Sequence, residues 1–299
     1  MKLVNAAKPE SKLDSEPQSR QLIRNVSDTA LWVAVYRADE SDRADAHFHD
    51  SFARRLAGQR GQEIADAMPF QKKNSWPFVA RTVLFDAFIN EQVNQGAEMV
   101  VNLAAGLDAR PYRMALPASL QWIEVDLPGI LDYKEGILAG EKPVCSLERI
   151  RLDLANISAR RELFQRLGQR AKKVLVVSEG LLGYLSEEEV GSLAVDLARP
   201  ASFERWVLDI GSPALMRMIM KKMNTHLDKA GAPLKFGPQE GPGFFTRYGW
   251  KPVEVRSVFK AAEKLNRLPL FMRLISLISD TEKFQAKRPW SGICLFEKK

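Results

Sequence analysis

The spacing of hydrophobic positions changes near residue 96 and divides the chain into two parts. Before this point, apolar residues recur every three or four positions over residues 27–37 and 78–95, which is the spacing of amphipathic helices. The charged stretch between them, residues 37–50, is typical of a surface loop. After residue 96, short runs rich in β-branched residues alternate with helix-like stretches. The predicted strands are residues 99–103, 122–125, 150–152, 174–177, 206–210, 253–255 and 293–296.

Strands that alternate with helices predict a doubly wound α/β sheet. The run at residues 174–177 is continuously apolar, as expected for a strand buried on both faces of a mostly parallel sheet. A single domain over residues 21–299 accounts for the layout, with residues 1–20 as a loose, charged tail. Its expected parts are a helical cap (21–95), a ligand-binding half (96–211), a helical insertion (212–245) and C-terminal strands with a helix (246–299).

The insertion at residues 212–245 interrupts the alternation of strands and helices. Four of the nine methionines fall on one predicted helix there, namely Met216, Met218, Met220 and Met223. Methionine adapts to varied apolar surfaces, so this helix could form a lid over a pocket. A helix that simply packs onto the core would show the same stripe, so both interpretations stand.

Composition and charge exclude several classes of protein. With 45% hydrophobic and 27% charged residues among 299, the chain is typical of globular proteins. The net charge is +7, but the basic residues are interspersed with acids, which argues against a nucleic-acid partner. The chain shows neither an apolar signal stretch nor a membrane-spanning run, and its two cysteines predict no disulfide framework. We therefore expect a cytoplasmic protein with no membrane partner.

Residues 102–110, which read NLAAGLDAR, directly follow the first predicted strand. Small residues at a strand-to-helix turn let a ligand approach the backbone and leave helix N–H groups free to bind it. Gly106 is the only glycine in this turn, whereas dinucleotide-binding loops carry three. A tight structural turn would look similar, so this stretch alone does not decide between the two interpretations.

Acidic residues close the following predicted strands: Asp126 in the word EVD (124–126), then Asp153, then Glu179. The carboxyl ends of parallel strands lie at one edge of the sheet, where open α/β sheets bind ligands. A rim of carboxylates suits ribose hydroxyls, an adenine amine and a positive centre, and it repels a pyrophosphate. The pattern therefore favours S-adenosylmethionine as cofactor, and an NAD(P)-dependent oxidoreductase is the alternative.

Several of these stretches together resemble the leucine carboxyl methyltransferase-like family. That family includes protein phosphatase carboxyl methyltransferases and many bacterial small-molecule O-methyltransferases. The resemblance covers roughly residues 29–209 and implies a seven-stranded, Rossmann-like class I methyltransferase sheet that binds S-adenosylmethionine through residues 96–211. The matching stretches are 29–50 (the opening of the bacterial branch), 81–86, 102–110 (family word NLGAGLDTR), 124–128 (EVDLP), 153–154 (DL) and 179–185 (EGLLGYL).

The resemblance also implies which residues contact the methionine part of the cofactor. Arg81 would bond the methionine carboxylate, and Gly106 with its neighbours would line the loop beside it. Glu179 would lie near the methionine amino group. No metal site is implied.

The remaining cofactor residues follow from the same resemblance. Asp126 would hold the ribose hydroxyls, while Asp153 and Leu154 would flank the adenine. Two positions depart from the family, because Ala104 replaces its first glycine and Ala109 replaces its threonine. The added methyl at Ala104 would either crowd the cofactor or be absorbed by a small backbone shift.

The bacterial-type opening and the apolar insertion predict an O-methyltransferase that acts on a carboxylate or hydroxyl of a small, apolar, polyketide-like metabolite. A carboxylate acceptor needs no base, whereas a hydroxyl does. No catalytic residue is predicted: His226 and Tyr184 could reach an acceptor, but structural roles fit them as well. His47 and His49 could at most form a weak metal pair.

Two alternatives remain, and the sequence predicts neither the acceptor nor the oligomeric state. One is a non-catalytic relative that binds the cofactor without transferring its methyl group. The other is a protein C-terminal carboxyl methyltransferase, which needs a basic clamp for the peptide carboxylate. The residues that would form this clamp are Arg217, Lys221, Lys222 and Arg247.

Overall fold

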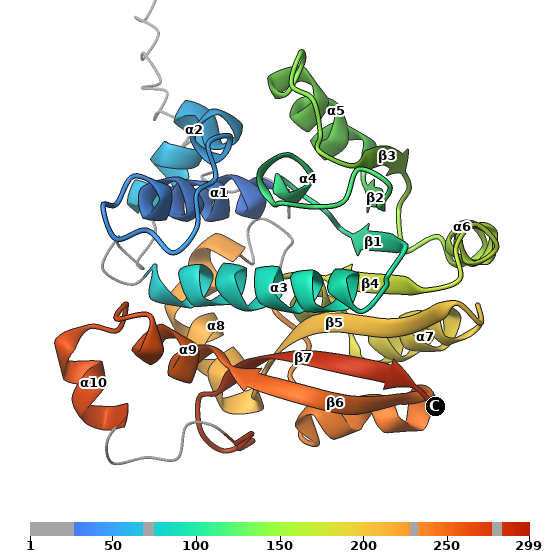
Figure 1. Cartoon of the computed structure of the whole chain (residues 1–299). Coiled ribbons are helices and arrows are strands. Elements are labelled where there is room, and N and C mark those ends of the chain that lie inside the picture. The colour runs from blue at the N-terminus through green and yellow to red at the C-terminus, as the bar shows by residue number, and fades with distance from the viewer. Residues whose placement is uncertain (1–26, 68–74, 228–232, 277–282) are drawn as a thin grey trace, which may run out of the picture.

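The protein is built around a seven-stranded sheet (Figure 1). The structure is a computed structural model, and it describes residues 27–67, 75–227, 233–276 and 283–299. The strand order is β3-β2-β1-β4-β5-β7-β6. All neighbours from β3 to β5 pair in parallel, and β7 pairs antiparallel with both β5 and β6. The strands are β1 (Met99–Leu103), β2 (Gln121–Asp126), β3 (Ser146–Arg151), β4 (Val174–Ser178), β5 (Phe203–Gly211), β6 (Trp250–Ser257) and β7 (Ser291–Lys298). The predicted doubly wound, mostly parallel sheet is confirmed.

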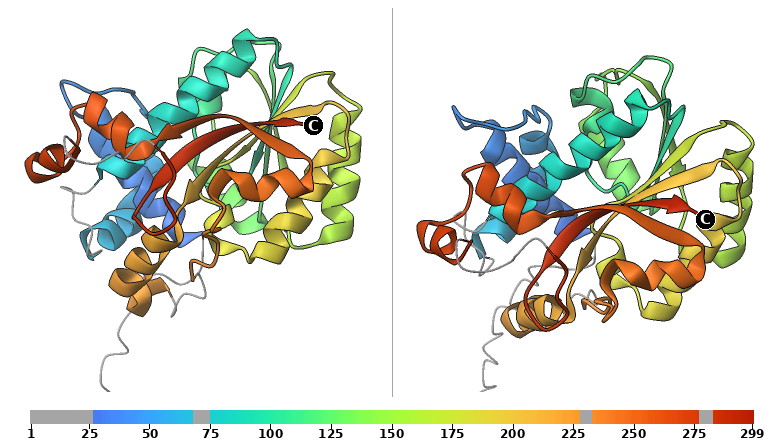
Figure 2. Two further views of the ribbon diagram at one scale, coloured as in Figure 1. Left: turned by 90° about the horizontal axis from the view of Figure 1, so that it is seen from below. Right: turned by 60° about the horizontal axis from the view of Figure 1, so that its bottom comes forward.

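Helices cover both faces of this twisted sheet (Figure 2). Strand residues alternate between two hydrophobic clusters: Val174 and Val176 pack on one side, Leu175 and Val177 on the other. Because β1 and β4 are buried along their whole length, both faces must be apolar, which explains their unbroken hydrophobic runs. The helices after the cap are α3 (Trp76–Asn94), α4 (Arg110–Arg113), α5 (Pro128–Ile137), α6 (Ile157–Gly168), α7 (Glu187–Ala198), α8 (Pro213–Leu227), α9 (Val258–Lys264) and α10 (Leu270–Ser276), with 3-10 turns η2 (Leu182–Tyr184) and η3 (Gly241–Tyr248).

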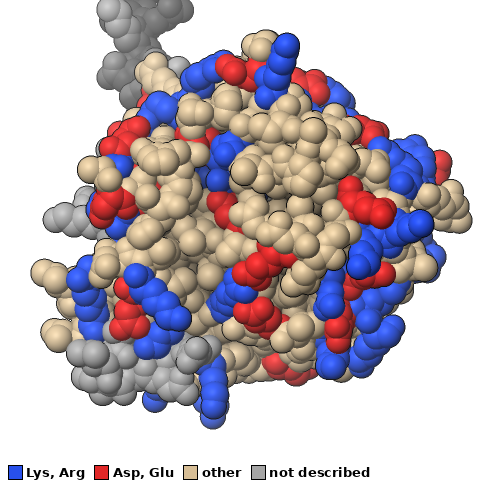
Figure 3. Space-filling view, viewed as in Figure 1, with Lys and Arg blue, Asp and Glu red and all other residues tan. Residues whose placement is uncertain are grey.

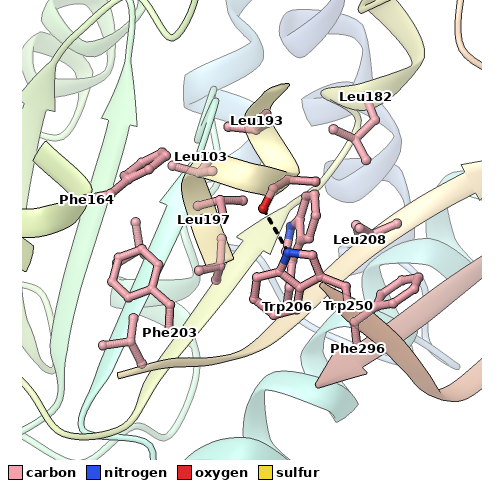
Figure 4. Close-up of a cluster of buried hydrophobic side chains, with 14 of the residues drawn as sticks. Leu103, Phe164, Leu182, Leu193, Leu197, Phe203, Trp206, Leu208, Trp250 and Phe296 are labelled. Carbon is pink, nitrogen blue, oxygen red and sulfur yellow. Dashed lines mark hydrogen bonds between the residues drawn. The ribbon is translucent and has the colours of Figure 1, made fainter. Parts of the chain in front are cut away.

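Two tryptophans lie at the centre of the cluster between the sheet and α7 (Figure 4). The indole N–H of Trp206 donates to Ser178 Oγ at 3.0 Å, and that of Trp250 donates to the carbonyl of Ala194 at 3.0 Å. Both side chains therefore bury a large apolar area without leaving a polar atom unsatisfied. This packing fixes α7 against β5 and β6.

Two helices, α1 (Asp28–Ser41) and α2 (Ala53–Ala67), form a cap over the carboxyl edge of the sheet. Their apolar faces share a cluster with Leu107 and Ala109, which lie in the loop after β1. The cap thus packs directly on the loop that the sequence singled out. α2 was not predicted from the hydrophobic pattern.

The prediction that residues 37–50 form a surface loop was wrong at three charged positions. Helix α1 extends to Ser41, and Arg37, Glu40 and Asp50 are buried. Arg37 Nε lies 3.0 Å from Asp50 Oδ2, and its Nη2 donates to the carbonyl of Leu107 at 2.6 Å. Paired charges can be buried where isolated ones cannot, and this pairing is invisible in the sequence.

The predicted insertion contains α8, whose side chains are described only as far as Lys221. Met216 packs closely against the backbone of Gly211 and Gly237, whereas Met218 is exposed. The side chains of Lys222, Met223 and His226 lie outside the described residues. The predicted tail, residues 1–20, lies outside them too.

The surface carries both signs of charge, and basic and acidic side chains alternate over the face shown in Figure 3. Among the helices that the structure describes, none has the length and apolarity to cross a membrane.

Candidate active site

A cavity of about 470 Å³ lies at the carboxyl edge of the sheet, under the cap. Its walls come from the loop after β1, the ends of β2 and β4, the segment after β3, helix α1 and the start of α3. The structure brings all the predicted cofactor residues to this one cavity, while their individual contacts with a cofactor stay predictions. These residues are Arg81, Ala104, Gly106, Asp126, Asp153, Leu154 and Glu179.

The loop after β1 adopts a left-handed backbone at two lining positions. Gly106 has φ +49° and Ala104 has φ +53°. Glycine accepts this conformation freely, whereas a residue with a Cβ is destabilised there by about 1–2 kcal/mol. At position 104 the backbone conformation therefore favours the glycine that the family has there. Ala104 strains the loop.

Asp126 connects this loop to the end of β2. Its Oδ2 accepts the N–H of Gly106 and its Oδ1 accepts the N–H of Leu127, both at 2.7 Å. Burial raises the pKa of Asp126, and these two hydrogen bonds partly oppose that rise. Each carboxylate oxygen keeps a further lone pair, so Asp126 can also accept hydrogen bonds from a ligand.

Glu124, two residues earlier on β2, is not among the cavity residues. It is fully buried, with Lys134 Nζ at 2.7 Å from its Oε1 and Arg149 Nε at 2.9 Å from its Oε2. This closed ion triad ties β2 to α5 and β3. Of the two acids in the EVD word, only Asp126 lines the cavity.

Glu179 and Arg81 meet at the opposite side of the cavity. Arg81 Nε lies 3.0 Å from Glu179 Oε1, and Arg81 Nη1 lies 3.5 Å from Asp209 Oδ2 at the end of β5. The buried Nε–H of Arg81 nevertheless makes no hydrogen bond within the described residues. A buried donor without an acceptor is costly, so Arg81 is suited to receive an anionic ligand.

Gly180 allows this approach of Arg81. It has φ +69°, and a Cβ at this position would lie only 3.3 Å from Arg81 Nη1. Its N–H donates to Asp209 Oδ1 at 2.8 Å, and burial raises the pKa of Asp209. The sequence did not indicate that Asp209, near the end of β5, contacts Arg81 and the residue after Glu179.

Arg110 was also missed, because an arginine in a loop usually indicates a solvated surface. It is buried and contacts carboxylates on three different elements. Burial raises the pKa of Asp108, but the neighbouring Arg110 guanidinium overcomes this and the pKa falls to about 2. The family word that contains both residues was the signal that could have indicated their pairing.

Asp153 and Leu154 line the part of the cavity that follows β3. Asp153 Oδ1 accepts the N–H of Ala155 at 2.9 Å, and the carbonyl of Leu154 accepts from Arg160 Nη1 at 3.0 Å. Ile157 adds an apolar surface beside them. Apolar walls with a carboxylate at the rim suit a flat heteroaromatic group that carries an amine.

Tyr184 lines the cavity near the cap, with its hydroxyl 3.4 Å from Thr29 Oγ1. Burial raises the pKa of Tyr184, so the phenol stays protonated at neutral pH and is not a base. His47 Nε2 contacts the Leu265 carbonyl and His49 Nδ1 contacts the Ser41 carbonyl, and neither lines the cavity. The described part of the chain contains no group of three or more His, Cys, Asp or Glu placed to bind a metal.

Solved structures of other proteins share this fold. A DUF574 family protein of Streptomyces avermitilis superposes with a TM-score of 0.59 at 13% identity, covering 89% of this chain and 97% of the other. At this identity the likeness concerns the fold alone.

Sequence relatives identify the family. A protein of Parafrankia sp. (strain EAN1pec), named "Putative S-adenosyl-L-methionine-dependent methyltransferase", is 32% identical over 83% of this chain and 84% of its own length. A protein of Streptomyces coelicolor with the same description is 32% identical over 62% of this chain and 69% of its own length. The family model for leucine carboxyl methyltransferase matches residues 30–198. The chain therefore belongs to the leucine carboxyl methyltransferase family of S-adenosylmethionine-dependent enzymes.

Proposed function

We propose that this enzyme methylates a carboxylate or hydroxyl oxygen of a small apolar molecule, using S-adenosylmethionine held in the cavity under the cap. One observation carries the proposal: the matching family residues surround a single cavity that apolar side chains also line. These apolar side chains include Trp32 and Val33 of α1 and Phe78 of α3. They offer an apolar acceptor a place beside the cofactor residues.

The residues at the β4 side fit the methionine part of the cofactor. The free Nε–H of Arg81 supports its role as the partner of the methionine carboxylate. Glu179 supplies the negative charge that an ammonium group requires. The two side chains already lie next to each other, as the ammonium and carboxylate of one amino acid would demand.

The residues at the β2 and β3 side fit the nucleoside. Asp126 has lone pairs for the ribose hydroxyls, and its two backbone hydrogen bonds hold the carboxylate in place. Asp153 and Leu154 would flank the adenine. The resulting rim of acids also matches the positive sulfonium centre, whose bound methyl is the electrophile that the reaction uses.

The chain's own groups position the acceptor oxygen rather than deprotonate it. No histidine is among the described residues that line the cavity, and the raised pKa of Tyr184 makes its hydroxyl a hydrogen-bond donor. An acceptor that is ionised at neutral pH, such as a carboxylate, needs only to be held at attack distance. The described lining thus supports a carboxylate over an aliphatic alcohol.

A protein C-terminus is less well supported as the acceptor. Arg217 and Lys221 are exposed on α8, and Arg247 pairs with Glu240. These three members of the expected basic clamp are absent from the cavity's described lining. The fourth, Lys222, has a side chain outside the described residues.

Calorimetric titration with S-adenosylmethionine and with S-adenosylhomocysteine tests the proposal. The wild type should bind both, and Asp126→Asn should weaken both about tenfold or more because it removes a charged acceptor. The matched control is Asp132→Asn, an exposed aspartate of α5 that pairs with Arg151, does not belong to the described cavity lining and should leave affinity unchanged.

Transfer is tested with labelled cofactor against a panel of small carboxylates, phenols and alcohols. Methylated carboxylates or phenols are the expected products. Binding without any product would instead identify a non-catalytic relative. Wild-type protein that binds NAD but neither adenosyl compound would overturn the proposal.

A further inference from the structure

Arg110 lines the cavity and forms ion pairs with three carboxylates. Its Nε lies 2.6 Å from Asp86 Oδ1, and its Nη1 lies 3.0 Å from Asp108 Oδ2 and 2.8 Å from Glu179 Oε2. These carboxylates come from α3, from the loop after β1 and from the end of β4. One guanidinium therefore joins the three elements that form this side of the cavity.

Because the site is buried, the three carboxylates can stay close together only if Arg110 supplies its positive charge. The residue is only 2% exposed, and its guanidinium lies 5.7 Å from the ring centre of Phe85. Three carboxylates so close together repel one another strongly where water is excluded. Without Arg110 they would move apart or take up protons, and Glu179 would lose its position.

Glu179 is held from two sides, but the two contacts differ. Arg110 contacts Oε2 and has two further carboxylates that fix its own guanidinium. Arg81 lies 3.0 Å from Oε1 through a nitrogen whose hydrogen finds no acceptor in the described structure. The Nε–H of Arg81 is therefore available to a ligand carboxylate, whereas the guanidinium of Arg110 already pairs with three carboxylates.

We propose that Arg110 is a positioning residue that holds the Glu179 carboxylate in place for the ammonium group of the cofactor's methionine part. This inference rests on the proposed function, which gives Glu179 that role. Arg110 acts through Glu179. When Arg81 binds the methionine carboxylate, Arg110 is the cation that still holds Glu179.

A neighbouring arginine provides a matched control. The Arg113 side chain is 5% exposed, against 3% for Arg110, and its Nη1 and Nη2 donate to Asp86 at 2.7 and 2.8 Å. Its second acidic neighbour is Asp50 of the cap, at 3.8 Å. The described ion pairs of Arg113 do not include Glu179. Removing the Arg113 guanidinium therefore disturbs Asp86, as the loss of Arg110 does, but leaves Glu179 held in place.

The experiment compares two ligands that differ only in the methionine part. S-Adenosylhomocysteine carries the ammonium and carboxylate groups, and 5′-methylthioadenosine lacks both. Arg110→Gln should weaken S-adenosylhomocysteine about tenfold or more and change 5′-methylthioadenosine less than about twofold. Arg113→Gln should leave the ratio of the two dissociation constants near the wild-type value.

Two results would overturn the inference. One is an equal loss of affinity for both ligands in Arg110→Gln, which would indicate a general structural role. The other is the same change of ratio in Arg113→Gln. If Arg110→Gln does not fold, as judged by thermal melting, Arg110→Lys takes its place. Lysine keeps the positive charge but lacks the planar set of N–H donors of arginine. The ratio of the two dissociation constants should therefore shift in the same direction by a smaller factor.

Failure of the underlying function looks different. Wild-type protein that binds neither S-adenosylmethionine nor S-adenosylhomocysteine contradicts the proposed function before any variant is made. Wild-type binding with an unchanged ligand ratio in the Arg110 variants contradicts only the positioning role.

Discussion

Two glutamates held by ion pairs, Glu124 and Glu179, show how similar chemistry serves different ends. Glu124 lies in the carboxyl-terminal part of β2, and Glu179 directly follows β4. Each has two cationic side chains beside it. The partners of Glu124 close around it, and its side chain is fully buried. Glu179 faces the cavity, and one of its partners keeps an unused donor. The ligand site and the structural triad carry similar charges. They differ because Glu179 faces the cavity and because one donor beside it has no acceptor.

The largest effect should come from opening the structural triad. Glu124→Gln removes the carboxylate nearest to Lys134 and Arg149, and Arg149 then has Glu135 Oε1 at 3.7 Å as its remaining described acid. Breaking a buried pair is destabilising by about 3–5 kcal/mol. Denaturant unfolding measures this loss. The control Glu148→Gln removes an exposed partner of Arg170 and should change stability by less than about 1 kcal/mol. Equal effects at both positions would show that the buried triad contributes no more to stability than an exposed ion pair.

Glu179→Gln should give the opposite pattern. We expect S-adenosylmethionine affinity to fall about tenfold or more, because the ammonium loses a charged partner, while unfolding changes less than in Glu124→Gln. Titration calorimetry and thermal melting on the same sample check the two quantities. A variant that loses stability as Glu124→Gln does, with normal affinity when folded, would assign Glu179 a structural role.

The strained loop should give a smaller, stabilising effect. Ala104→Gly relieves a left-handed alanine, and after the entropic penalty of glycine the gain should be about 0.5–1 kcal/mol. Cofactor affinity should be maintained or improved. Ala105→Gly is the control: this neighbour has no positive φ, so the same substitution should destabilise the fold. Destabilisation by both changes would show that the strain at Ala104 is compensated.

The last prediction concerns a shift along the pH scale at Asp126, on the same strand as Glu124. Burial raises its pKa above the ordinary value of 3.8. Only the ionised carboxylate accepts hydrogen bonds through both oxygens, so cofactor affinity is complete above this raised pKa and falls as the pH drops through it. The loss should therefore begin at a higher pH than an ordinary aspartate would give. Asp126→Asn should remove this step from a plot of affinity against pH.

The central strands could be predicted because burial on both faces leaves a continuous apolar run, as in residues 174–177. Strand β3 begins at Ser146, four residues before the prediction, because four of the six residues of this edge strand are polar or charged and none is fully buried. Helix α2 lacked a recognisable pattern, and it is kinked at Gly58. Edges and kinks depend on tertiary context that hydrophobic spacing does not report.

The acids at the strand ends could be located from the sequence, because parallel strands place their carboxyl ends together. Arg81 followed only from the family resemblance, since it lies on α3, before the first strand. The burial of Arg110 and of the pair Arg37 with Asp50 was not predicted, because it depends on partners on other elements, such as Asp86 of α3 for Arg110. Ion pairs across elements are a property of the fold, and residue type alone does not reveal them.

The direction of β7 has a practical consequence for work with this enzyme. Its register places Ser291 opposite Gly211 and Glu297 opposite Arg205, so residue 299 lies where β5 begins, at the end of the sheet away from the cavity (Figure 1). Lys298 Nζ donates to the Pro200 carbonyl and the Lys299 N–H to that of Gly249, which anchors this end. An affinity handle or reporter joined at residue 299 would therefore hold the molecules on a sensor surface with their ligand entrances turned away from the support.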